Sequence, residues 1–139
     1  MSRLRALRSP AAGLWLLAVL AFLTPHVQAD PAQIVRVEMR EFAFRPSTIR
    51  LGAGRPVRLV FTNRGQIAHQ FEAAALRSVP AVVSHGGLRV ETTGLDIVRL
   101  QPGGTATLDL YIRSRGRFRF ACTIEGHAEA GMVGILELR

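Results

Sequence analysis

The only cysteine of the sequence, Cys122, lies in the segment that most restricts how this chain can fold. In residues 117–122 the two phenylalanines and the cysteine alternate with the two arginines. This alternation predicts a strand with one buried face, so Cys122 ends a strand and points into the protein. His127 follows five residues later, and Met132 five residues after that. We therefore expect a thiolate, an imidazole and a thioether to lie near the end of one strand.

These three donors predict a copper site. Type 1 copper is bound by two histidines and a cysteine in a trigonal plane, with a weak axial methionine, whereas tetrahedral zinc sites use cysteine, histidine and carboxylate ligands. Gly126 and Gly131 allow the tight loop that brings His127 and Met132 back toward Cys122. Each of the three donors alone would more often be a packed or surface residue. Their order within eleven residues favours a site for one copper ion, completed by a second histidine from elsewhere.

The run CTIEGHAEAGMVG resembles the ligand loop of the cupredoxins, the plastocyanin- and azurin-like small blue copper proteins. The upstream run NRGQIAHQF resembles the cupredoxin segment that carries the first copper histidine. The resemblance implies His69, Cys122, His127 and Met132 as the metal ligands, and an all-β Greek-key sandwich of seven or eight strands. Many cupredoxins have proline before the Gly-His pair, where this chain has Glu125.

Short alternating runs separated by glycine and proline agree with a β-sandwich. Near position 41 the alternation in the first run changes parity, which predicts a bulge or bend. We expect Phe71 to pack inward and Gln70 to hydrogen-bond the ligand loop. Residues 73–95 look like an irregular connection, and His85 within it is interpreted as solvated. The expected strands are 33–44, 48–51, 56–63, 96–100, 105–112, 117–122 and 131–138.

The N-terminus has the pattern of a secretory signal peptide. Three arginines precede an apolar run at 11–23, and small residues precede Asp30. We expect residues 1–29 to be the signal peptide and 30–139 a single copper-binding domain, exported to the periplasm or beyond. If the signal is not cleaved, it would serve as an N-terminal membrane anchor; otherwise no membrane span is expected.

The net charge of the chain is positive, and all of its Lys/Arg positive charge comes from arginine because the chain has no lysine. Residues 30–139 keep 18 − 3 = 15 basic and 10 acidic residues, a net charge of +5. Aromatic residues are too few to suggest nucleic-acid binding. Arginines at 113, 115, 117 and 119 form either a solvated strand face or a docking surface for an acidic redox partner such as a cytochrome or oxidoreductase. We expect a monomer.

These features predict single-electron transfer between redox proteins by Cu(I)/Cu(II) cycling, with His127 as the exposed edge of the site. A periplasmic copper carrier or metallochaperone would use the same ligands. A metal-free β-sandwich interaction module is the third interpretation. An enzyme is not expected, because four protein ligands leave no open position for a substrate.

Overall fold

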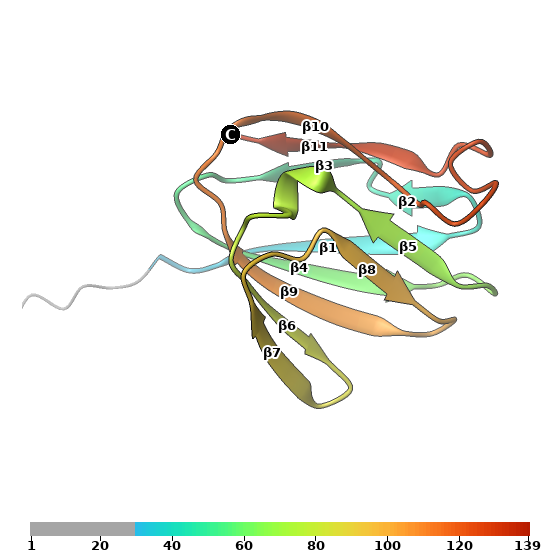
Figure 1. Ribbon diagram of the computed structural model, residues 1–139, viewed down its shortest axis with the longest axis horizontal. Coiled ribbons are helices and arrows are strands. Elements are labelled where there is room, and N and C mark those ends of the chain that lie inside the picture. The colour runs from blue at the N-terminus through green and yellow to red at the C-terminus, as the bar shows by residue number, and fades with distance from the viewer. Residues whose placement is uncertain (1–29) are drawn as a thin grey trace, which may run out of the picture.

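The computed structural model describes residues 30–139, which form two β-sheets packed face to face (Figure 1). The predicted signal peptide lies outside the described residues. The six-stranded sheet has the order β2-β1-β4-β9-β6-β7, and the five-stranded sheet has the order β3-β11-β10-β5-β8. The strands are β1 (Gln33–Arg40), β2 (Ala43–Arg45), β3 (Thr48–Leu51), β4 (Pro56–Asn63), β5 (His69–Glu72), β6 (Ala81–His85), β7 (Leu88–Thr92), β8 (Ile97–Leu100), β9 (Thr105–Tyr111), β10 (Gly116–Ala121) and β11 (Val133–Leu138).

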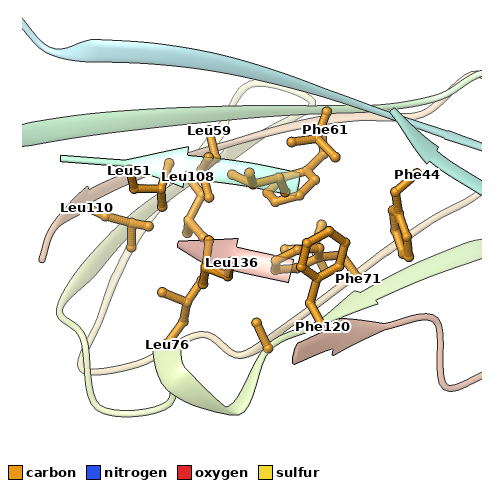
Figure 2. Packing of buried hydrophobic residues seen from close by; sticks show 14 of the residues in the cluster. Phe44, Leu51, Leu59, Phe61, Phe71, Leu76, Leu108, Leu110, Phe120 and Leu136 are labelled. Atoms are coloured by element: carbon orange, nitrogen blue, oxygen red, sulfur yellow. The ribbon is translucent and has the colours of Figure 1, made fainter. Parts of the chain in front are cut away.

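The core lies between the two sheets, because the alternating apolar residues of each strand face inward. Figure 2 shows phenyl rings gathered at one end of this core and leucine side chains at the other. Phe71 contacts three of the rings, with centroid distances of 4.8 Å to Phe61, 4.9 Å to Phe120 and 6.2 Å to Phe44. Full burial of one such side chain contributes about 1.5–3 kcal/mol. The predicted all-β sandwich is confirmed.

The bulge or bend predicted near position 41 is a full reversal of the chain, a hairpin turn. Met39 pairs with Phe44 and Arg40 with Ala43, so β2 runs back along β1 after a two-residue turn. The parity of the apolar residues changes because the chain reverses direction. Phe42 occupies the left-handed region with a φ of 58°. Consequently Glu41 and Phe42 lie at the tip of a hairpin, at the same end of the sandwich as the loop between β10 and β11 (Figure 1).

Residues 73–95 are more regular than the sequence predicted. One short 3-10 turn, Ala74–Leu76, precedes a hairpin of β6 and β7. Gly86 and Gly87 both have positive φ, at 54° and 83°, as a two-residue hairpin turn requires. With β2, this hairpin raises the number of strands in residues 30–139 to eleven, so the predicted seven or eight was too low. No helix in this part of the chain is long and apolar enough to cross a membrane.

Candidate metal centre

Three of the four predicted ligands meet at one end of the sandwich. His69 is the first residue of β5, Cys122 directly follows β10, and His127 lies in the loop that leads to β11. One donor atom from each side chain lies within 4.8 Å of the others. His69 and Cys122 are fully buried, and His127 is 7% exposed. Residues 53 positions apart in the chain (122 − 69) are therefore brought together by the pairing of β5 with β10.

Backbone hydrogen bonds hold Met132, the fourth predicted ligand, beside the same loop. The Cys122 N–H donates to the Met132 carbonyl at 2.9 Å, and the Met132 N–H donates to the His127 carbonyl at 2.9 Å. The Met132 side chain is fully buried and belongs to the same core cluster as Cys122. Gly126 and Gly131 have φ values of 79° and 103°, conformations that side-chain-bearing residues rarely adopt. The loop 122–132 is thus closed on itself by its own backbone.

Gln70 ties this loop to β5, as the sequence predicted. Its backbone N–H donates to the Cys122 sulfur at 3.3 Å, and its side-chain amide donates to the Thr123 hydroxyl at 2.5 Å. Both contacts fix the position of Cys122 relative to His69, the residue before Gln70.

His69 has two buried ring nitrogens with no hydrogen-bond partner among residues 30–139. Burial lowers the pKa of His69 below its ordinary value, and the nearby His127 lowers it further. The ring is therefore neutral, the form that binds metal. Leaving a buried polar group unpaired costs about 1–3 kcal/mol. A metal ion would supply one partner, so this orphaned ring fits a ligand role.

The Nδ1 atom of His127 lies 3.3 Å from the Cys122 sulfur. Its ring packs edge-on against Phe42, with centroids 5.3 Å apart, and its centroid lies 5.2 Å from that of His69. Phe42 is itself 43% exposed. His127 was expected to be the exposed edge of the site, but it is buried, with Phe42 at the tip of the β1–β2 hairpin packed against its ring.

Two residues that organise the site were not recognised from the sequence. Asn63 is the first and is fully buried. Its side-chain amide donates to the Ile67 and Leu100 carbonyls at 2.8 and 3.0 Å, and its side-chain oxygen accepts from the Gly65 N–H at 2.9 Å. The one available signal was its place at the end of a strand, six residues before His69.

Glu41 is the second of these residues. Its carboxylate accepts a hydrogen bond from the Gln66 backbone N–H, and this bond holds the pKa of Glu41 below its usual range. One carboxylate oxygen lies 3.9 Å from Nε2 of His69. Only the change in alternation near position 41 pointed to this part of the chain.

The other candidate residues lie away from the three donors. His85 is exposed, and its Nδ1–H donates to the Thr105 carbonyl at 2.7 Å, which agrees with its interpretation as solvated. The four arginines of the predicted stripe are exposed, and Arg117 pairs with Glu137 at 3.4 Å.

Two imidazoles and a thiolate meet within 4.8 Å, with the buried Met132 thioether in the same core cluster as Cys122, and donors of these kinds suit copper. All four side chains are buried, so the arrangement can hold an ion away from bulk solvent. Such a site can keep a metal bound, pass it on, or cycle it between two oxidation states.

Comparison with known proteins gives the same picture. The copper-resistant cuproprotein CopI of Rubrivivax gelatinosus is 34% identical, over 83% of this chain and 72% of its own length. The protein of the same name from Pseudomonas aeruginosa is 28% identical, over 86% and 83%. Among solved structures, auracyanin from Roseiflexus castenholzii superposes with a TM-score of 0.56 at 18% identity, over 79% of this chain and 99% of its own.

Residues 13–133 match the family described as cupredoxin-like domain. This match covers the two sheets up to the first residue of β11 and includes all four predicted ligands. Together with the donor set, it confirms copper as the predicted cofactor. The chain therefore belongs to the cupredoxin-like family.

Proposed function

We propose that this chain is an exported copper-handling protein that keeps one copper ion in a closed site formed by His69, Cys122, His127 and Met132. The observation that carries this proposal is the buried cluster of His69, Cys122 and His127, in which both His69 nitrogens lack a hydrogen-bond partner within the described part of the chain, residues 30–139. The CopI relatives, whose name describes them as copper-resistant, support a role in copper tolerance. Copper tolerance requires an ion to be held or handed on, and this is the carrier function.

The protein's own residues supply what such a site needs. Bound copper would add a metal centre able to change its oxidation state. The Cys122 thiolate provides the soft anionic donor, and the Gln70 N–H fixes its position. Burial keeps His69 neutral and ready to bind. Since the Phe42 ring covers His127, copper is shielded from bulk solvent on the side where the site comes nearest to the surface.

Electron transfer is the second candidate, and one observation favours it. The loop 122–132 and β5 hold the ligands through backbone hydrogen bonds, so Cu(I) and Cu(II) would share nearly the same frame. A frame of this kind lowers the rearrangement that accompanies gain or loss of an electron. Phe42 and His127 would then form the path to a redox partner, and the exposed arginines would attract an acidic one.

The first experiment separates these functions. We expect the Cu(II)-loaded protein to show an intense visible charge-transfer band and narrow copper hyperfine splitting in its EPR spectrum, both lost in Cys122→Ser. Competition with a Cu(I) chelator then measures retention, and electron self-exchange measured by NMR line broadening tests cycling. Tight Cu(I) retention with slow self-exchange supports handling, whereas fast self-exchange supports electron transfer. A protein that binds neither ion would leave the metal-free interaction module.

Export is part of the proposal and rests on the N-terminal sequence. We expect the protein in the periplasmic fraction, with residue 30 as its first residue. A protein that starts at residue 1 and sediments with membranes would show that the N-terminal segment stays as an anchor. Recovery from the cytoplasm would contradict export.

A further inference from the structure

The ring of His69 has two nitrogens, and a metal at the cluster can take only one of them. Nε2 is the nitrogen that faces the Glu41 carboxylate, at 3.9 Å, so Nδ1 is left for the metal. A histidine that binds a metal through one nitrogen carries its proton on the other, and this N–H needs an acceptor. Among residues 30–139, no hydrogen-bond partner reaches Nε2.

We propose that Glu41 is a positioning residue for the copper site, whose carboxylate accepts the Nε2–H hydrogen bond of His69 when copper is bound. This inference rests on the proposed copper-binding function and adds to it an anionic group that fixes the ring of His69 and favours Cu(II). Glu41 is not itself a ligand, since the donor cluster consists of His69, Cys122 and His127 without it.

The geometry leaves a direct path between the two groups. A Cβ atom added at Gly65 would lie 2.5 Å from a Glu41 oxygen and 2.7 Å from Nε2 of His69. The absence of a side chain at position 65 therefore lets the carboxylate and the ring face each other. Closing the gap to hydrogen-bond distance takes a shift of about 1 Å. The hydrogen bond from the Gln66 N–H holds the Glu41 carboxylate at the edge of the site, within this distance of the His69 ring.

A negative charge hydrogen-bonded to a ligand stabilises the more positive copper ion. Acceptors of this kind typically contribute 10- to 100-fold in metal affinity. For Glu41→Ala we therefore expect Cu(II) affinity to fall at least tenfold relative to Cu(I) affinity. A tenfold change in that ratio corresponds to a rise in reduction potential of about 59 mV.

The test compares four variants of the copper-loaded protein. Glu41→Ala removes charge and acceptor, Glu41→Gln removes only the charge, Gly65→Ala inserts a methyl group between the partners, and Glu125→Gln is the control that removes an exposed charge from the ligand loop. The measurements are the reduction potential and, in the Cu(I) form, exchange of the His69 Nε2–H proton followed by ¹⁵N NMR. Urea unfolding of the metal-free variants detects any loss of fold.

We expect wild type to show a slowly exchanging Nε2–H proton. Glu41→Gln should keep this proton protected at a raised potential, while Glu41→Ala and Gly65→Ala should lose the protection. Glu125→Gln should leave the proton protected and change the affinity ratio less than threefold. If wild type binds copper and both Glu41 variants and Gly65→Ala match it in proton exchange and potential, Glu41 only anchors the turn to Gln66 and the inference is wrong. A wild type that binds no copper would overturn the proposed function itself, and with it this inference.

Discussion

Replacement of Asn63 tests whether the segment leading into His69 is set by one buried side chain. Asn63 is fully buried and makes three side-chain hydrogen bonds, two as a donor and one as an acceptor. These bonds join the end of β4 to the loop before His69 and to the end of β8. If these bonds are lost, the free energy of unfolding should fall, and His69 should no longer be held in the same position.

The expected magnitude follows from the number of bonds. A hydrogen bond contributes about 0.5–1.5 kcal/mol net, so losing three should lower the free energy of unfolding by about 1.5–4.5 kcal/mol in Asn63→Ala. Asn63→Asp should be at least as damaging at neutral pH, because a carboxylate would replace the amide that donates to the Ile67 and Leu100 carbonyls. Domains are typically stable by only about 5–15 kcal/mol, so the change is easily measured.

The assay is urea unfolding of the metal-free protein, followed by copper titration of the folded fraction. Gln101→Ala is the control, since it removes an exposed amide from the neighbouring turn and should change stability by less than about 0.5 kcal/mol. A loss below about 1 kcal/mol in Asn63→Ala, together with unchanged copper affinity, would refute the view that this side chain builds the loop.

Three further predictions concern the same end of the molecule. The lowered pKa of His69 means that the unfolded chain takes up a proton first on acidification, so the stability of the metal-free protein should fall as the pH drops below about 6.5. Urea midpoints between pH 8 and 5, above the range in which carboxyl groups titrate, should show this for wild type and His85→Gln but not for His69→Gln. Phe71→Ala should cost about 3–5 kcal/mol in the same unfolding assay, because it leaves a cavity among three phenyl rings. Phe42→Ala should speed loss of Cu(I) to a competing chelator, since the ring no longer covers His127; an unchanged rate would show that the site opens elsewhere.

The ligand loop could be predicted from sequence because its information is local. Cys122, His127 and Met132 lie within eleven residues, and the alternation before Cys122 gives the direction of the sulfur. The strands β3, β4, β8, β9 and β11 were predictable for the same reason, since period-2 alternation bounded by glycine or proline is a local pattern. The placement of His69 needed the resemblance to a family, because nothing local distinguishes it from an ordinary strand histidine.

The remainder depends on pairing between distant segments. Whether the change of parity near Glu41 is a bulge or a hairpin is decided by the pairing of β2 with β1, which the alternation alone does not fix. The same turn places Glu41 beside His69 and Phe42 over His127, across 69 − 41 = 28 and 127 − 42 = 85 residues. Burial of Asn63 likewise follows from its contacts with the loop before His69 and with the end of β8. The Gly86-Gly87 pair between alternating residues was a local hairpin signal, and its strands were recognisable in principle.

The copper site extends the core, and this predicts how the protein behaves without metal. Phe71 lies two residues after His69, and Phe120 two residues before Cys122, so ligands and phenyl rings share the inward face of their strands. Because the core is built from buried apolar side chains of both sheets, removing copper should leave the fold intact, unlike zinc fingers, which unfold without metal. Copper should still stabilise the folded protein by mass action. It should add about 2.7 kcal/mol to the free energy of unfolding when free copper is 100 times the dissociation constant, and so raise the unfolding temperature. Circular dichroism of the chelator-treated protein measures both effects. If the metal-free protein showed no cooperative transition, then copper, and not the core beneath the site, would be what organises this end of the sandwich.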